Sequence, residues 1–260
     1  MSKLGRFDEA EGAIQAAFGR VDQKLLARMY LQTGRFERAK AVLDKLATTT
    51  PTDVDVPYYQ GVLLLRQYQT EAARKQLEAA IKLKSDDTRV KETLPELPDA
   101  QKLGAPKLTG EALYQLQLAQ SLLDARNPLE ASVVLQGALK ANPKDLHLNF
   151  YYGYALYQIA DPDDAVDQFS DTLKLAPDNV VVMSWLALTY ISNGRMDLAV
   201  TTANGSITKD AKYARAYLVL GLANFALGNV AQAREAFLKT VGVNADFKIL
   251  VDPYLNALPK

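Results

Sequence analysis

Alanine recurs in this sequence at a fixed spacing of 34 residues. Two series share the spacing: Ala39 and Ala73, and then Ala131, Ala165, Ala199 and Ala233. A period of this length is typical of arrays in which one small unit is stacked many times, because a single unit cannot bury its apolar face alone. The repeat therefore constrains the fold more than any other feature of the chain.

Other positions of the repeat recur in register with this alanine, which is counted here as position 20 of each unit. Position 8 is always small: Ala27, Gly61, Ala119, Gly153, Ala187 and Gly221. Position 24 is always apolar: Leu43, Leu77, Leu135, Phe169, Ala203 and Phe237. Small residues at positions 8 and 20 are expected where two helices cross closely. Proline at position 32 in three units, Pro51, Pro143 and Pro177, ends a second helix.

Each unit therefore predicts a helical hairpin, with glycine in the turn at position 15 in three units, Gly34, Gly194 and Gly228. The pattern resembles the tetratricopeptide repeat family, whose signature runs aromatic, x-x-Leu-Gly, x-x-Tyr, then Ala, x-x-x-Phe and Pro. The segment AYLVLGLANFALGNVAQAREAF, from Ala216, fits it best. The resemblance implies an all-α fold, an α-solenoid in which antiparallel helical hairpins stack into a right-handed superhelix.

The resemblance also divides the chain. We expect an N-terminal block of a half repeat and two repeats at 1–85, a linker or insertion at 86–111, a C-terminal block of four repeats at 112–246, and a capping segment at 247–260. The insertion follows from the 58 residues between Ala73 and Ala131, one period plus 24. Its three prolines and two glycines oppose one continuous helix.

The two ends of the chain are unusual for such an array. The opening LGRFDEAEGAIQAAF matches only the second half of a unit, with Ala10 at position 20. This suggests a piece of a longer array, or the loss of an upstream signal or anchor. The ending FKILVDPYLNALPK is apolar, whereas terminal caps of solenoids usually have a polar outer face. It either folds against the last hairpin or docks onto a second copy or a partner.

Positions 2, 5, 6, 9 and 13 lie on one face of the first helix of each hairpin. In this family that face lines the concave side, which holds partners. In the stretch FYYGYALYQIA, at 150–160, three aromatic residues occupy these positions. The predicted partner-binding groove consists of Tyr58, Tyr59, Val62, Phe150, Tyr151, Tyr154, Trp185, Leu188, Leu218 and Leu222. A helix or an extended peptide with apolar side chains is the expected occupant.

An alternative interpretation leaves these aromatic residues without a partner, filling a tight superhelix or lying beneath the insertion or the C-terminal segment. Large exposed apolar patches are uncommon on soluble monomers, which favours the groove. Some members of the family instead grip the C-terminal carboxylate of chaperone tails with lysine, asparagine and arginine. Lys24 matches the first of these positions, but Arg28 and Tyr59 replace asparagines. We therefore do not expect a carboxylate clamp.

Composition narrows the partners further. Thirty basic residues balance thirty acidic ones, so no overall positive field attracts nucleic acid or anionic lipid, and neither is an expected partner. No apolar run reaches the roughly 18 residues of a membrane span, so we expect no direct insertion into a membrane. The absence of cysteine excludes disulfides and thiolate metal sites but fits the cytoplasm and the bacterial periplasm equally. The localisation stays open between them.

Catalytic groups are scarce. His147 is the single histidine, and we interpret it as a surface residue near the rim of the groove. DPDDAVDQFSD lacks the glycine and the distal glutamate of a calcium loop, and Asp161 and Asp163 fit helix caps. No phosphate loop, dinucleotide fingerprint or G-x-S-x-G motif occurs. We expect no enzymatic activity, no cofactor and no metal.

The sequence thus predicts a non-catalytic protein–protein interaction scaffold or adaptor that binds an apolar segment of a partner protein in its concave groove. One alternative is a self-assembling, homo-oligomeric scaffold. Another is the targeting module of a larger bacterial envelope, secretion or pilus assembly protein. The fold alone does not decide between these functions.

Overall fold

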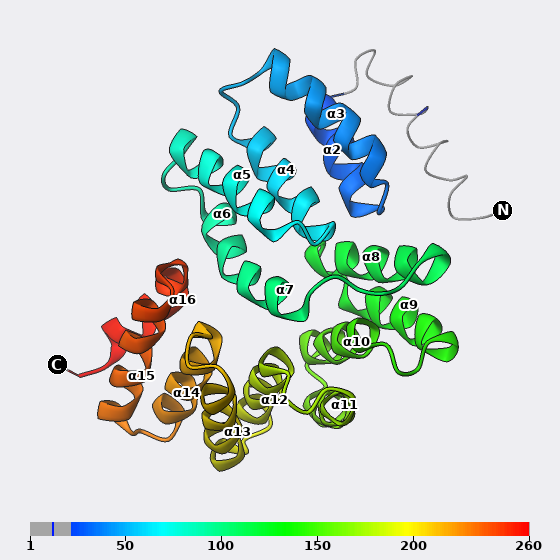
Figure 1. Cartoon of the computed structure of the whole chain (residues 1–260). Helices are drawn as coiled ribbons and strands as arrows, with labels where there is room; N and C mark the ends of the chain where they lie inside the picture. The colour runs from blue at the N-terminus through cyan, green and yellow to red at the C-terminus, as the bar shows by residue number, and fades with distance from the viewer. Residues whose placement is uncertain (1–11, 13–21, 260) are drawn as a thin grey trace.

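The computed structural model describes residue 12 and residues 22–259, so most of the half repeat expected at the N-terminus lies outside the described residues. The described chain contains six helical hairpins: α2 (Gln23–Gln32) with α3 (Phe36–Thr49), α4 (Asp55–Arg66) with α5 (Thr70–Leu83), α8 (Gly110–Asp124) with α9 (Pro128–Ala141), α10 (Leu146–Ile159) with α11 (Pro162–Leu175), α12 (Val180–Ser192) with α13 (Met196–Lys209), and α14 (Ala214–Ala226) with α15 (Val230–Val243). Within each block the hairpins stack in chain order, and α8 of the C-terminal block packs against α2 of the first hairpin (Figure 1). The predicted all-α fold, a right-handed superhelix of antiparallel hairpins, is confirmed.

The helices begin where side chains can accept hydrogen bonds from free backbone N–H groups. Asp145 accepts from the N–H of Leu148 at 2.9 Å, and Asp161 accepts from that of Asp164 at 3.3 Å, as the sequence predicts. Asn179 accepts from the N–H groups of two residues of α12. Such caps satisfy donors that have no partner within the helix and so define where each hairpin starts.

Every hairpin turn has a left-handed residue at position 15. The φ values lie between 57° and 76° for all six: Gly34, Tyr68, Arg126, Ala160, Gly194 and Gly228. Glycine adopts this conformation without steric cost, whereas other L-residues do so at a cost of roughly 1–2 kcal/mol. Three hairpins thus carry a non-glycine residue under backbone strain.

The core of each hairpin is the contact between positions 8 and 24. A Cβ atom on Gly153 would lie 2.9 Å from the Phe169 ring, and one on Gly221 would lie 2.5 Å from the Phe237 ring. Both phenylalanines are fully buried. Glycine is therefore required where the facing residue is phenylalanine, which is the steric reason for the small residues at position 8.

The insertion between the two blocks forms α6 (Thr88–Thr93), the 3-10 helix η1 (Leu94–Glu96) and α7 (Leu97–Leu103). Pro95 and Pro98 lie in the first turns of η1 and α7, where a missing N–H costs little. Val90, Leu94 and Leu97 pack into the core of the α4–α5 hairpin. Leu103 instead packs against residues of the C-terminal block, including Phe150. The insertion therefore lies between the blocks (Figure 1).

The C-terminal segment folds back onto the last hairpin. It forms η2 (Ala245–Phe247) and α16 (Lys248–Ala257), and Phe247, Val251 and Leu258 are buried against α14 and α15. It also reaches the N-terminal block, where Arg74 Nη1 of α5 lies 2.9 Å from Asp246 Oδ2. The C-terminal block therefore curves around the insertion, and the C-terminal segment comes to lie beside α6 and reaches α5 of the second hairpin (Figure 1).

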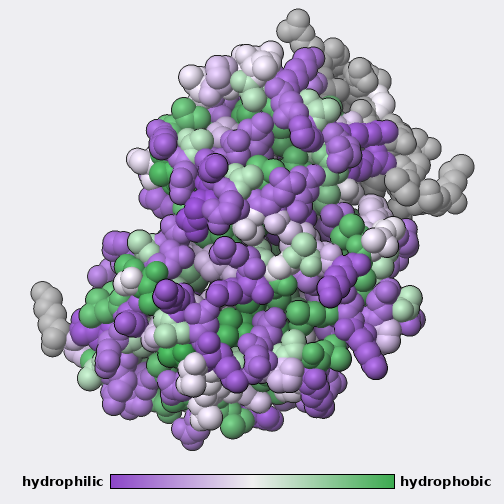
Figure 2. All heavy atoms as spheres, viewed as in Figure 1, coloured by the Kyte–Doolittle hydropathy of each residue, from purple (hydrophilic) through white to green (hydrophobic). Residues whose placement is uncertain are grey.

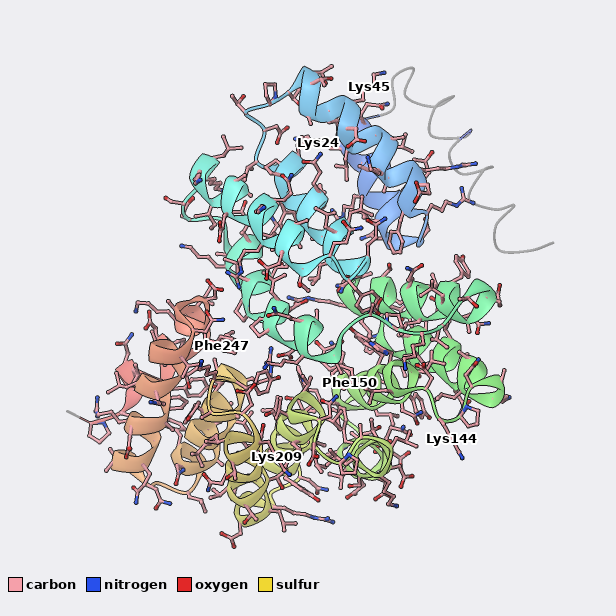
Figure 3. The ribbon with its side chains drawn as sticks, viewed as in Figure 1. Lys24, Lys45, Lys144, Phe150, Lys209 and Phe247 are labelled. Carbon is pink, nitrogen blue, oxygen red and sulfur yellow. The ribbon has the colours of Figure 1, made fainter. Side chains whose placement is uncertain are left out.

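This curved array has an inner and an outer side. Figure 3 shows Phe150 and Phe247 on the inner side, while Lys45 and Lys144 lie at the periphery. On the face shown in Figure 2, apolar residues are scattered among hydrophilic ones and form no single large patch. No helix in the described part of the chain is both long and apolar enough to span a membrane.

Candidate functional site

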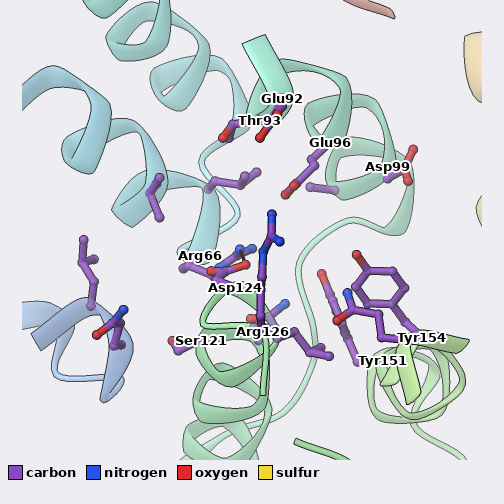
Figure 4. A pocket seen from close by; sticks show the side chains of 18 of the residues that line it. Arg66, Glu92, Thr93, Glu96, Asp99, Ser121, Asp124, Arg126, Tyr151 and Tyr154 are labelled. Carbon is purple, nitrogen blue, oxygen red and sulfur yellow. Dashed lines mark hydrogen bonds and ion pairs between the residues drawn. The ribbon is translucent and has the colours of Figure 1, made fainter. Parts of the chain in front are cut away.

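A hollow of about 780 Å³ lies on the inner side of the array. Its wall is built from α2 and α4 of the N-terminal block, from the insertion, and from α8, α10, α12 and α14 of the C-terminal block. Seven of the ten predicted groove residues line it: Tyr58, Tyr59, Val62, Phe150, Tyr151, Tyr154 and Trp185. Positions 5, 6 and 9 of separate repeats are thus brought together around one space. Figure 4 shows Tyr151 and Tyr154 in its wall.

The other three predicted residues lie away from the hollow. Leu218 and Leu222 pack under the C-terminal segment, in a cluster that includes Phe247 and Val251. Leu188 packs against the small core of the α12–α13 hairpin. The return of the chain after α15 covers this part of the inner face.

The aromatic residues of the wall contact one another. The rings of Tyr154 and Trp185 meet edge to face with centroids 4.7 Å apart, and Phe150 and Tyr151 meet in the same way at 5.1 Å. Phe150 is only 4% exposed and belongs to the core, whereas Tyr151, Tyr154 and Trp185 are partly exposed. Amphipathic rings of this kind can cover an apolar side chain and still offer a polar edge.

The carboxylate of Asp99, on α7, is held by three residues of the C-terminal block. It accepts hydrogen bonds from the Tyr213 hydroxyl at 2.7 Å and from Trp185 Nε1 at 3.0 Å. Arg215 Nε lies 2.7 Å from the same carboxylate, and both side chains are about nine-tenths buried. The carbonyl oxygen of Pro95, also in the insertion, accepts a further hydrogen bond from Arg215 Nη2 at 3.2 Å. The insertion is thereby fixed to the C-terminal block.

A second ion pair joins the two blocks directly. Arg66, at the end of α4, donates from Nε to Asp124 Oδ2 at 2.9 Å and from Nη2 to the other carboxylate oxygen. Arg66 is 8% exposed. A paired arginine with two parallel donors has a defined orientation, so this pair positions α4 against α8 at the floor of the hollow (Figure 4).

A polar network lies next to this pair. Tyr68 accepts a hydrogen bond from Gln120 Nε2 at 2.8 Å, and its ring meets that of His147 edge to face. His147 Nε2 lies 2.9 Å from the carbonyl oxygen of Gly104 and donates to it. His147 is 5% exposed, so the expectation of a surface histidine is wrong. Burial lowers the pKa of His147, because the return of the chain after α7 covers a residue that the repeat alone leaves at the rim.

Glu96 carries the most perturbed carboxyl group of the hollow. Its side chain is open to the hollow, but protein walls surround it, and the resulting loss of hydration raises the pKa of Glu96 to about 7. The nearby Arg66 guanidinium partly offsets this effect, while Asp124 adds to it. Near neutral pH this carboxyl group is therefore divided between its charged and neutral forms.

Arg126 contributes an accessible positive charge to the wall. The side chain extends from the turn after α8 into the hollow (Figure 4). It is exposed, and within the described part of the chain it has no hydrogen bond or ion pair. A guanidinium group presents up to five donors to an incoming acceptor.

The charged residues of the wall were not among the predicted groove residues. Arg215 occupies position 2, and Arg66 and Asp124 occupy position 13 of their units. Both positions belong to the inner face defined by the repeat, so scanning them for charge finds these three. Nothing in the repeat points to Asp99 or Glu96, because both belong to the insertion. Among the described residues, no group of three or more histidine, aspartate or glutamate side chains could hold a metal ion.

Two curated proteins are similar to parts of this chain. The small glutamine-rich tetratricopeptide repeat-containing protein 2 of Saccharomyces cerevisiae is 29% identical over 107 residues, which are 41% of this chain and 30% of that protein. The heat-shock protein cognate co-chaperone sgt12 of Aspergillus fumigatus is 33% identical over 82 residues, or 32% of this chain and 24% of that protein. The chain thus spans less than a third of either relative.

Solved structures agree on the fold. A thermophilic tetratricopeptide repeat protein of Thermus thermophilus superposes with a TM-score of 0.54 at 15% identity, over 79% of this chain and 99% of that protein. At this identity the likeness concerns the fold alone.

The family model for the tetratricopeptide repeat matches residues 2–54, 24–88, 116–180, 156–214 and 186–246. These ranges cover most of the chain and leave out most of the insertion and the C-terminal segment. Proteins built from this repeat are in general non-catalytic modules of protein–protein interaction. The recurring positions, the stacked hairpins and the family model agree that the chain belongs to the tetratricopeptide repeat family.

Proposed function

We propose that this chain is a non-catalytic scaffold that holds a segment of a partner protein in the hollow. The observation that carries the proposal is the convergence of aromatic residues from both blocks, Tyr59, Tyr151, Tyr154 and Trp185 among them, on one space of about 780 Å³. A helix about 11 Å wide that rises 1.5 Å per residue occupies roughly 140 Å³ per residue. The hollow is therefore of a size for a short segment and not for a folded domain.

The wall favours a segment with both apolar and charged side chains. Covering about 100 Å² on each of four rings contributes roughly 10 kcal/mol before the costs of association, which are of similar size. Because these two contributions nearly cancel, the rings alone give weak binding, and micromolar affinity, about −8 kcal/mol, requires further contacts with the charged groups of the wall. Arg126 and Glu96 would favour a segment with polar or charged groups beside its apolar ones.

The co-chaperone relatives support a role in protein interaction, but the contacts of Lys24 argue against capture of a chaperone tail by a carboxylate clamp. Lys24 is the single residue that matches the clamp, and its Nζ lies 2.9 Å from Asp53 and 3.0 Å from Asp55. These two carboxylates raise the pKa of Lys24, and its ammonium group is already paired with them. A ligand carboxylate would have to displace both.

Two matched substitutions test the proposal. Val62 lines the hollow, while Val133 is 69% exposed on α9 and does not. Peptides are selected by phage display against the wild-type protein, and their affinities are then measured by fluorescence anisotropy. We expect Val62→Glu to weaken binding at least tenfold and Val133→Glu to leave it unchanged, with equal helicity by circular dichroism. The opposite pattern would place the site on the outer surface and overturn the proposal.

Self-assembly is the second candidate function, favoured by an apolar pair on the outer face of α9. Leu129 and Val133 lie one turn apart and are 64% and 69% exposed. Such a pair can dock onto a second copy. Light scattering across a range of concentrations tests this, since a strict monomer at high concentration removes self-assembly and leaves the hollow as the binding site.

A further inference from the structure

Helix α7 occupies the inner face of the C-terminal block in the manner of a bound segment. It presents one carboxylate, that of Asp99, to Trp185, Tyr213 and Arg215. Trp185 and Arg215 occupy positions 6 and 2 of consecutive repeats, both on the face where partners are expected to bind. A segment from the middle of the chain thus lies where a partner segment would.

The three residues that bind Asp99 form a preformed binding site for a carboxylate. Arg215 is 7% exposed, and its guanidinium lies over the rings of Trp185 and Phe247, at 4.9 and 5.5 Å from their centroids. The rings fix its orientation and exclude water. A buried guanidinium without a carboxylate partner is strongly unfavourable, so the C-terminal block requires an acidic group at this place.

The insertion is attached to the two blocks by different means. Val90, Leu94 and Leu97 join it to the N-terminal block through an apolar core. Its contacts with the C-terminal block are mainly polar: the Asp99 carboxylate, the Pro95 carbonyl, and an ion pair between Lys102 and Asp210, with Leu103 as the buried apolar contact. The attachment to the C-terminal block can therefore be exchanged without unfolding the N-terminal block.

We propose that Trp185, Tyr213 and Arg215 form a carboxylate site that α7 fills in cis through Asp99, and that an acidic segment of a partner protein competes with α7 for it. The sequence of the insertion indicates the chemistry of that segment. Asp99 stands between Leu97 and Leu103 in LPELPDAQKL at residues 94–103, a segment that also contains Glu96. The inference rests on the proposed function only in taking the partner to be a protein segment.

Because α7 is tethered beside the carboxylate site and competes for it, the apparent affinity of the site for a separate ligand is low. A segment on a short linker is present at an effective concentration in the millimolar range, and it also holds its carboxylate in place. An acidic peptide then binds the wild-type protein only weakly. A substitution at Asp99 weakens its binding to Trp185, Tyr213 and Arg215. It exposes the carboxylate site but leaves these three residues unchanged, which allows a direct test.

The test uses a labelled peptide with the sequence of residues 94–103 and the full chain. Asp99→Asn keeps the shape of the side chain but removes its charge. We expect this variant to bind the peptide at least tenfold more tightly than the wild type, by fluorescence anisotropy. A control peptide with asparagine in place of the aspartate equivalent to Asp99 should not bind. Adding Arg215→Ala to Asp99→Asn should abolish binding.

Hydrogen exchange of residues 88–103 shows whether the insertion has been released from the C-terminal block. If Asp99→Asn does not release it, Asp99→Lys must, because a second positive charge then faces Arg215. Failure of both to release it overturns the proposal. Release without binding of the acidic peptide, or equal binding of the asparagine peptide, overturns it as well. Whatever the outcome at Asp99, the proposed function predicts that Val62→Glu weakens binding of the peptides selected by phage display. Failure of the carboxylate-site proposal can therefore be distinguished from failure of the proposed function.

Discussion

The left-handed residues at position 15 show how one backbone requirement is met by different side chains. Gly34, Gly194 and Gly228 meet it without strain. Tyr68 adopts the strained conformation, and its hydroxyl oxygen accepts a hydrogen bond from Gln120 Nε2 of the other block. Arg126 accepts it and places its guanidinium in the hollow. Strained residues of this kind cluster at functional sites. Ala160, whose side chain is a single methyl group, has no comparable function.

Ala160→Gly should therefore stabilise the protein. Relief of the left-handed strain contributes roughly 1–2 kcal/mol, and the greater freedom of glycine in the unfolded chain offsets about 0.5–1 kcal/mol of it. We expect the free energy of unfolding to rise by about 0.5–1 kcal/mol, measured by urea denaturation. Gly194→Ala, at the equivalent place with φ of 70°, should lower it. Shifts of the same sign in both variants would contradict the role of the backbone.

Glu96 makes stability depend on pH in a direction unusual for a carboxyl group. Its folded-state pKa is about 7, above the usual value of about 4.3 in an unfolded chain. Between these two values the folded state binds a proton that the unfolded state has released. The contribution of Glu96 to the free energy of unfolding is thus greatest below about pH 4 and declines as pH rises to about 7.

Glu96→Gln removes this dependence because glutamine stays neutral. We expect the melting temperature of the variant, relative to the wild type, to rise from pH 4.5 to pH 7.5 and then to level off. Thermal denaturation at four pH values in this range provides the measurement. A constant difference between the two proteins would mean that Glu96 is ionised throughout.

At the level of residues, the sequence predicts the aromatic wall but not how the charged residues of the wall pair. Tyr58, Tyr151 and Trp185 could be assigned to the inner face because a single helix defines which positions share a face. The pairing of Arg66 with Asp124 joins residues 58 positions apart, and that of Tyr213 with Asp99 joins residues 114 apart. Such pairs depend on how the blocks are placed, which no local pattern contains.

Within a hairpin, the two helices are matched in volume. Gly153 and Gly221 face phenylalanine, while Ala27 and Ala119 at the same position belong to hairpins with leucine at position 24. In the second hairpin, however, glycine faces leucine, and a Cβ on Gly61 would lie 2.8 Å from Leu77, so the closeness of the two helices also decides whether alanine fits. Close packing accounts for this, since neither a void nor an overlap is tolerated at the crossing point.

Gly221→Ala should destabilise the last hairpin by about 1–3 kcal/mol, because the new Cβ would lie 2.5 Å from the Phe237 ring. Adding Phe237→Leu should recover part of the loss, since this pair then matches that of Ala119 and Leu135. A double-mutant cycle by urea denaturation measures the coupling. Additive effects of the two changes would show that they do not meet in the folded state.

The helices of the repeats follow from the sequence more directly than those of the insertion. The period of 34 places each turn at position 15 and each crossing at positions 8 and 20, and the structure confirms the hairpins. In the insertion the pattern is too short for a period. Pro95 and Pro98 oppose one continuous helix, but they also suit the first turns of two short helices. Which of these roles prevails depends on the blocks that pack against the insertion.

The whole molecule is closed by contacts between distant parts of the chain. Arg74 and Asp246 are 172 residues apart and form an ion pair between α5 and η2. The repeat predicts that the array curves, but the angle between successive hairpins depends on the sizes of many side chains at once. The return of the C-terminal segment to the N-terminal block could therefore not be predicted from the period.

Asp246→Lys should open this closure, because it places two positive charges opposite each other. We expect a loss of about 0.5–1 kcal/mol in the free energy of unfolding, a larger radius of gyration by small-angle X-ray scattering, and faster hydrogen exchange in α16. The exchanged pair Arg74→Asp with Asp246→Lys should restore all three. If the double variant remains as open as the single one, the closure depends on contacts other than this pair.

The insertion has a further consequence for the array as a whole. The insertion lies between the second and third described hairpins and packs along the inner side of the curve. It therefore sets the distance between the two blocks and the width of the superhelix. One more helical turn in α7 would add about 5.4 Å to its length and force the two blocks apart, while every repeat kept its own core. In such a scaffold, the width of the opening can change in evolution through changes in the length of the insertion, which belongs to no repeat.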